Sequence, residues 1–163
     1  MTPDEHFRDG LTALSAGRSF EAADHFRRAV ATEKRLGADR PNMRYISFYG
    51  LSLALCRRAT RTAIELCEKA AAHDSFDAVL LLNLGKVYAI SGRTTKALAT
   101  YERGLRVDPS NKRLQIELAR IERRREPALP ALGRDHVINR SLGRLRASLF
   151  AKKPRGAGAR PPR

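Results

Sequence analysis

The chain has 163 residues, of which 42% are hydrophobic and 6% aromatic, and its formal net charge is +15. This length suits one domain or one short repeat array, and the apolar content excludes a wholly disordered chain. Few aromatic residues and many alanines favour helices over a β-sandwich. The basic excess leaves nucleic acid, an anionic membrane and an acidic protein open as partners.

The basic charge is concentrated in the C-terminal quarter. Residues 120–163 hold 13 basic and 3 acidic residues, a net charge of +10, whereas the other 119 residues hold 19 and 14, a net charge of +5. Most of the cations are arginine, so the compositional bias of a GC-rich genome is an alternative origin of the excess. The body of the chain is therefore nearly balanced, and two-thirds of the excess belongs to its C-terminal quarter.

Cysteine usage and the N-terminal sequence bear on the compartment. Cys56 and Cys67 lie inside apolar helical patterns, which is typical of small core residues and not of a disulfide framework. The N-terminus is polar and acidic, and the longest apolar run, Ala78–Leu82, is too short to span a bilayer. We therefore expect a cytoplasmic protein without a signal peptide.

Capping and breaking signals predict the first pair of helices. The segment Thr2–Glu5 reads as an N-cap, a proline at the first helical position and the glutamate of a capping box. Gly17 ends this first helix, and Ser19 is the expected N-cap of the second. Two helices joined by a short turn are thus expected before residue 36.

Similar signals predict two further pairs. A longer linker is expected at Leu36–Pro41, and Arg57–Thr60 is the expected turn of the second pair. Ser75 is the expected cap of the next helix, Thr94 begins its partner, and Asp108-Pro109 stops that partner. A further amphipathic helix comes after Ser110 and reaches the arginines at 123–125, which suit the C-terminus of a helix.

Small residues repeat through the three pairs at matching positions. The two small residues of each second helix recur with steps of 41 and then 34 residues between units, and within each unit they are seven residues apart, or two helical turns. Small side chains on one face let a neighbouring helix approach closely. The three sets are Gly10, Ala22 and Ala29; Gly50, Ala63 and Ala70; and Gly85, Ala97 and Gly104.

With these residues the chain resembles the tetratricopeptide repeat (TPR) family. The third unit matches the family signature best. The first two units lack some signature residues; the first, for example, has Ala13 where the family has a large residue. Its signature residues are Leu81, Leu84, Gly85, Tyr88, Gly92, Ala97, Tyr101, Gly104 and Asp108-Pro109. An unrelated alanine-rich helical bundle is the alternative.

The resemblance implies an all-α fold, an α-α superhelix or TPR solenoid of three helix pairs with a C-terminal capping helix. The repeats would cover about 3–36, 42–74 and 77–110, and the capping helix about 111–126, so the array would span 1–126. Such units stack to share one core, because a single pair cannot bury its apolar face alone.

The resemblance also implies a concave groove lined by the first helix of each pair. Most of the residues placed there are apolar, which suits a bound peptide or amphipathic helix; packing between repeats is the alternative for any single one. The expected groove residues are Phe7, Leu11, Leu14, Ser47, Leu51, Leu55, Leu82, Asn83, Lys86 and Ile90. A basic clamp for chaperone C-termini, known in some TPR proteins, is not expected, because Phe7, Leu11 and Phe48 occupy its positions.

The sequence after residue 126 reads as an appendage. A proline-containing connector and a short basic amphipathic helix are expected within 127–151, and a disordered basic tail within 152–163. The amphipathic helix would fold back on the array, bind a partner helix or lie on an anionic membrane. Nucleic acid or acidic lipid would meet the candidate anion-binding residues Arg140, Arg144, Arg146, Lys152 and Lys153.

No catalytic, metal or cofactor motif is recognisable. The four histidines are scattered, and neither a phosphate-binding loop nor a Gly-x-Ser-x-Gly sequence occurs. We therefore expect a non-catalytic protein–protein interaction adaptor that needs no cofactor. The alternatives are a secretion-type chaperone for a hydrophobic client and a nucleic-acid-associated factor that uses the basic tail.

Overall fold

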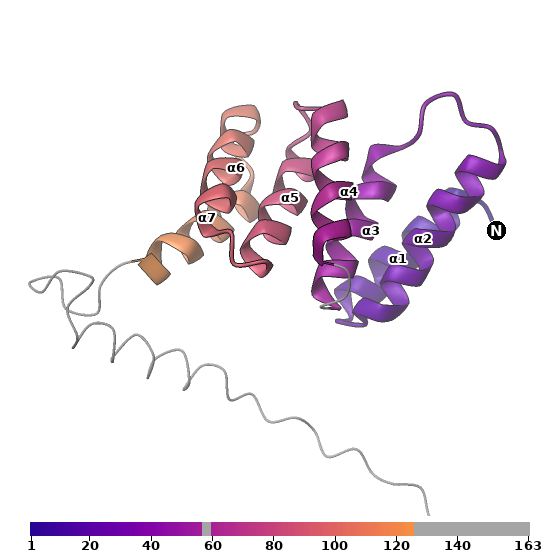
Figure 1. Cartoon of the computed structure of the whole chain (residues 1–163), viewed down its shortest axis with the longest axis horizontal. Coiled ribbons are helices and arrows are strands. Elements are labelled where there is room, and N and C mark those ends of the chain that lie inside the picture. The colour runs from indigo at the N-terminus through magenta and orange to yellow at the C-terminus, as the bar shows by residue number, and fades with distance from the viewer. Residues whose placement is uncertain (57–59, 126–163) are drawn as a thin grey trace, which may run out of the picture. The chain divides into compact units, whose positions relative to one another are not determined.

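The computed structural model describes residues 1–56 and 60–125, and within them the chain is all-α (Figure 1). Residues 57–59 of the turn expected at Arg57–Thr60, and every expectation for 126–163, lie outside the described residues, whereas Thr60 already lies in a helix. The described helices are α1 (Pro3–Ser15), α2 (Ser19–Arg35), α3 (Met43–Leu55), α4 (Thr60–His73), α5 (Ala78–Ile90), α6 (Thr94–Val107) and α7 (Lys112–Arg125).

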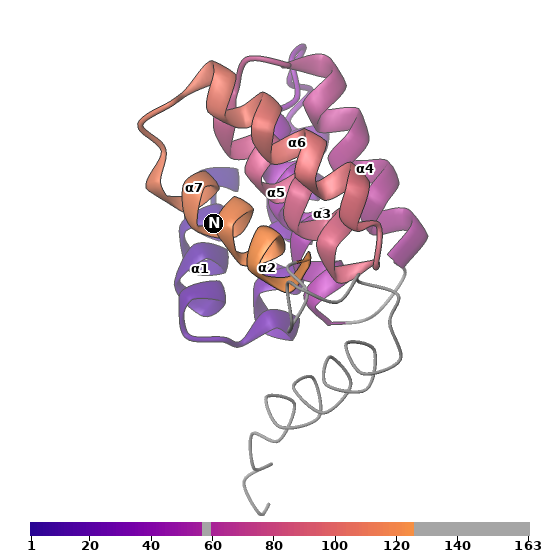
Figure 2. The same cartoon turned by 90° about the vertical axis from the view of Figure 1, so that its left-hand side faces the viewer.

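Consecutive helices pack as antiparallel neighbours. α1 packs on α2, α3 on α4 and α5 on α6, and α2 also contacts α3 while α4 contacts α5. The first helices of the second and third pairs, α3 and α5, contact each other directly. Figure 2 shows the end of this array formed by α6 and α7. The expected all-α superhelix is confirmed.

The helix starts agree with the sequence at α1 and at α6, which begins at Thr94 as expected, and differ at α2 and α5. Thr2 and Glu5 form the expected capping box, with Glu5 N donating to Thr2 Oγ1 at 3.2 Å and Thr2 N donating to Glu5 Oε2 at 2.8 Å. Ser19 is not the cap of α2, because it already lies in the helix and Arg18 precedes it without a side-chain cap. Nor does Ser75 cap α5. Asp77 does so, since its Oδ1 accepts from Val79 N at 2.8 Å.

The glycine of each first helix lies against a large side chain of its partner helix. A Cβ atom added to Gly10 would lie 2.6 Å from Phe26 Cε1, and one added to Gly50 would lie 2.7 Å from Cys67 Sγ. A Cβ on Gly85 would overlap the ring of Tyr101, which is fully buried. The repeated glycine therefore sets the distance between the two helices of a pair, as the spacing predicts.

The last described helix joins the core of the second and third pairs. Leu114 and Ile121 of α7 are buried in that core, and Leu114 lies against Gly104 of α6. Ile116, by contrast, is 54% exposed, so it lies off the buried face of the helix. The apolar residues of α7 therefore do not all face the array.

Candidate functional site

Helices α1, α2 and α3 meet in a cluster of aromatic rings. The Phe7 ring centroid lies 5.5 Å from that of Phe26, 4.9 Å from that of Tyr45 and 5.4 Å from that of Phe48. Leu11 packs against the same cluster, and both Phe7 and Leu11 are only half-buried. These two expected groove residues thus also hold the first helix pair against the second.

A buried polar link joins α3 to α5. Asn83 Nδ2 donates to Ser47 Oγ at 3.1 Å, and both side chains are buried. The Ser47 carbonyl accepts from Cys67 Sγ at 3.3 Å, so α4 joins the same network. Ser47 and Asn83 therefore position two helices beside the groove, where buried polar groups need partners.

A hollow of about 440 Å³ lies beside this link. Its walls come from α1, α3, α5 and the start of α7, so it lies among the first helices of the pairs, as expected for the groove. Apolar side chains share the lining with amide and cationic groups. The lining residues are Leu14, Phe48, Leu51, Val79, Leu82, Asn83, Lys86, Asn111, Lys112 and Arg113. We call this hollow the central pocket.

The structure brings five of the ten expected groove residues to the central pocket, namely Leu14, Leu51, Leu82, Asn83 and Lys86. Leu51 and Leu82 are almost wholly buried, so they form its floor. Leu55 and Ile90 lie at the C-terminal ends of α3 and α5, where they are 42% and 43% exposed.

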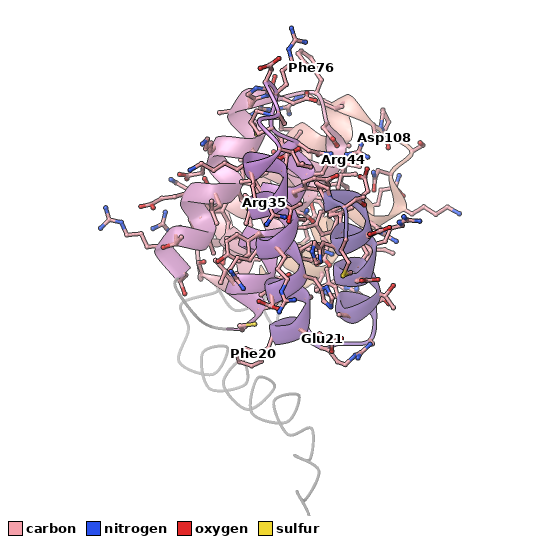
Figure 3. The ribbon with its side chains drawn as sticks, turned by 90° about the vertical axis from the view of Figure 1, so that its right-hand side faces the viewer. Phe20, Glu21, Arg35, Arg44, Phe76 and Asp108 are labelled. Atoms are coloured by element: carbon pink, nitrogen blue, oxygen red, sulfur yellow. The ribbon has the colours of Figure 1, made fainter. Side chains whose placement is uncertain are left out.

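Leu55 belongs to a second, more open hollow of about 500 Å³. Its other lining residues include Arg18, Phe20 and Cys56, and Phe20 is 60% exposed. Figure 3 shows Phe20 at one end of the helices, opposite Phe76, which is 81% exposed. Eight of the expected groove residues are therefore divided between two hollows and the aromatic cluster, whereas Ser47 is buried between α3 and α5 and Ile90 lines neither hollow.

The cationic wall at the start of α7 was not among the expected site residues. The family pattern assigns the groove to the first helix of each pair, whereas Asn111, Lys112 and Arg113 come after the third pair. Their sequence signal was only the amphipathic pattern of one more helix. The expected anion-binding residues of the tail lie outside the described residues.

Some of the cations around the central pocket have an acidic partner and others do not. Lys86 Nζ lies 3.8 Å from Glu117 Oε1, and the other oxygen of Glu117 is 3.2 Å from Arg120 Nη1. Lys112 and Arg113 have no acidic partner within ion-pair distance among the residues that the structure describes. This end of the pocket therefore carries uncompensated positive charge.

One buried thiol lies near the pocket. Burial raises the pKa of the Cys67 thiol to about 12, so this thiol is protonated at neutral pH. Across the described ranges, no three His, Cys, Asp or Glu side chains gather as a metal site would require. No helix in those ranges is long and apolar enough to cross a membrane.

Residues 78–121 match the family model of the tetratricopeptide repeat. This segment contains α5, α6 and the first part of α7, and two helix pairs of the same design precede it. This part of the chain is a tetratricopeptide repeat. A search of curated proteins finds no match.

Solved TPR domains share the fold at low sequence identity. The TPR domain of Arabidopsis OM64 is 20% identical over 74% of this chain and 94% of its own, with a TM-score of 0.58. The second TPR domain of human RPAP3, solved with the HSP70 peptide SGPTIEEVD, is 19% identical over 74% and 98%, with a TM-score of 0.55. The Sgt2 TPR domain of Aspergillus fumigatus is 14% identical over 97% and 88%, with a TM-score of 0.61.

Proposed function

We propose that this protein is a non-catalytic adaptor that binds a segment of another protein in its groove. The observation that carries the proposal is the central pocket, which has a buried leucine floor and a half-buried rim. Concave apolar sites with a few fixed polar groups are typical binding sites. The human RPAP3 domain, which shares the fold, is solved with a peptide bound. The proposed binding array is residues 1–126, with repeats at about 3–36, 42–74 and 77–110.

Two polar contacts join the helices that supply the floor of the pocket, which favours binding. The hydrogen bond between Asn83 and Ser47 holds α5 against α3, and Arg44 Nε lies 2.8 Å from Asp77 Oδ2, which joins the starts of the same two helices. A site whose walls are already ordered loses less conformational entropy when a ligand binds. Leu14 and Lys86 are proposed to contact the ligand, whereas Phe7, Leu11, Ser47, Leu51 and Asn83 shape the groove.

The test is selection of peptides from a random displayed library by the immobilised full chain. Leu51 and Leu82 are poor positions for the matching variants, because an acidic residue at such buried sites would unfold the protein. Val79 lines the pocket and is only half-buried, so Val79→Gln changes its wall with less effect on the core. Ala99→Gln, at an exposed position of α6 outside the pocket, is the matched control.

We expect the wild-type chain and the Ala99→Gln control to enrich the same peptides and Val79→Gln to lose them. Each variant is first compared with the wild type by circular dichroism, so that loss of binding is separated from loss of fold. If the chain enriches no peptide, or if Val79→Gln retains the enriched set with unchanged affinity, the proposed function is wrong.

A further inference from the structure

The central pocket combines an apolar floor with a cationic end. Leu51 and Leu82 supply the floor, while Lys112 and Arg113 line the side formed by the first turn of α7. An apolar floor alone does not distinguish one hydrophobic segment from another. The cationic end adds a charge preference, and its sign identifies the class of partner.

The acidic side chains around the pocket are already engaged. Asp108 accepts hydrogen bonds from Ser110 and Asn111, which lower the pKa of its carboxyl group, and Asp77 pairs with Arg44. Glu117 is shared by Lys86 and Arg120. None of these carboxylates is within 4.0 Å of Lys112 or Arg113 in the part of the chain that the structure describes.

The arrangement at the start of α7 is unfavourable for the isolated protein. The first turn of α7 contains no acidic residue, and its two cations lie where the helix dipole is positive. They also share the pocket with Lys86, a third cation. A bound carboxylate would relieve this repulsion, whereas a bound cation would add to it.

From this charge pattern we propose that the partner segment is acidic, with an apolar side chain in the central pocket and a neighbouring carboxylate against Lys112 and Arg113. The inference rests on the proposed groove function and narrows it. Phe7, Leu11 and Phe48 occupy the positions of the basic clamp that some TPR proteins use for chaperone C-termini. The carboxylate contacts proposed here are different, because Lys112 and Arg113 come after the third helix pair.

The same charge argument disfavours the chain's own C-terminal segment as the occupant. Residues 127–163 contain nine basic residues and one acidic residue, so their net charge has the same sign as the charge of the pocket. Among the groups available, the anionic side chains of another protein complement the pocket best. The basic residues of this segment are instead a competing site for acidic peptides, and the experiment must separate that site from the pocket.

The experiment uses the full chain and the same displayed peptide library. The double variant K112E/R113E reverses the cationic end, and K69E/R106E makes the same change in net charge at exposed positions of α4 and α6 that do not line the pocket. An enriched peptide is then synthesised in two forms, one with its Asp and Glu residues and one with Asn and Gln in their place. Binding is measured by fluorescence anisotropy at low and at raised salt.

We expect the enriched peptides to carry Asp or Glu next to a Leu, Ile, Val or Phe. K112E/R113E and the Asn/Gln peptide should each weaken binding by about tenfold or more, while K69E/R106E stays within about twofold of the wild type. Raised salt should reduce the difference between the acidic and neutral peptides. Circular dichroism should show both variants folded.

The outcomes that overturn the inference differ from those that overturn the proposed function. If Val79→Gln abolishes binding but the peptides show no acidic preference, the groove function stands and the acidic partner is wrong. The inference is also wrong if an acidic peptide binds K112E/R113E as tightly as the wild type, because the basic tail then accounts for the preference. If no peptide is enriched, both proposals fail.

Discussion

Asn83 Nδ2 donates a hydrogen bond to Ser47 Oγ at 3.1 Å and thereby joins α5 to α3 beside the central pocket. The two side chains are 2% and 0% exposed, so neither has water as an alternative partner. Removing one member leaves the other unsatisfied in the core, which costs more than the hydrogen bond itself contributes.

The first prediction concerns this pair. We expect Ser47→Ala and Asn83→Leu each to lower the free energy of unfolding by about 1–3 kcal/mol. The double variant should lose less than the sum, because no unsatisfied partner remains in it. Urea denaturation monitored by circular dichroism measures all four members of the cycle, and strictly additive losses would show that the pair is not coupled.

The second prediction concerns the repeated glycine of the third pair. At a solvent-exposed position of a helix, a substitution like Gly85→Ala would stabilise the protein by about 1 kcal/mol through helix propensity. Here the new methyl group overlaps the buried Tyr101 ring, so we expect a net destabilisation of about 1–3 kcal/mol. The sign of the change in the urea midpoint decides between the two effects.

Rescue identifies the cause of that destabilisation. Tyr101→Leu removes the ring atoms nearest the new methyl group, so Gly85→Ala should be less damaging in that background than in the wild type. An equal loss in both backgrounds would contradict the steric account. The comparison uses differences between variants, which cancels the intrinsic cost of removing the tyrosine.

These two cases show what the sequence predicts well. The glycine and alanine spacings predict the helix pairs, because close approach of two backbones admits few residue types. The link between Ser47 and Asn83 could not be predicted in the same way, since it joins positions 36 residues apart. The resemblance to the family places both residues in the groove by position, whereas stacking of the pairs buries both.

The errors at helix starts have a similar origin. Ser75 and Asp77 are both good capping residues, and the local sequence does not choose between them. Asp77 also pairs with Arg44 on α3, a contact that only the stacked pairs create. Likewise, Lys112 and Arg113 line the central pocket because α7 comes after the third pair and lies beside α5, which the repeat pattern does not specify.

The third prediction concerns thiol reactivity. Cys67 is fully buried and burial raises the pKa of its thiol to about 12, so it should react with a disulfide reagent only when the protein unfolds. In a Cys56→Ser variant at about pH 8, the labelling rate of Cys67 should therefore be proportional to the fraction of protein that is unfolded. Labelling at the rate of a small free thiol would contradict the buried position.

The fourth prediction concerns alkaline pH. Burial raises the pKa of Tyr45 to about 12, helped by the hydrogen bond that its hydroxyl donates to Asp4. A tyrosine whose pKa is raised in the folded state stabilises the protein at pH values below the ordinary tyrosine pKa of about 10. This contribution is lost as the pH rises toward the pKa of the tyrosine in the folded state. Tyr88, which donates to Glu68, behaves in the same way.

This pH dependence is tested by measuring the urea midpoints of the wild type and of a Tyr45→Phe/Tyr88→Phe variant at about pH 8 and about pH 11. We expect the wild type to lose more stability over that range than the variant, because only the wild type has these two groups to ionise. Deprotonation of lysine contributes to both proteins alike. Parallel pH profiles would contradict the assignment.

The fifth prediction separates stability from binding at α7. In K112E/R113E two acidic residues replace two basic residues in the first turn of the helix, where the dipole favours negative charge. We expect the free energy of unfolding to rise by about 0.3–1 kcal/mol per substitution at low salt, while affinity for an acidic peptide falls. Thermal denaturation with and without peptide gives both quantities, and a fall in stability would contradict the charge account.

The most direct test of the groove function is methyl NMR of the full chain with an enriched peptide. The methyl groups of Leu14, Val79 and Leu82 line the central pocket, whereas Leu36 and Leu66 lie outside it and serve as references. We predict that titration shifts the pocket methyl resonances saturably and leaves the reference methyl resonances in place. Saturable binding that leaves the pocket methyl resonances unmoved would contradict the account.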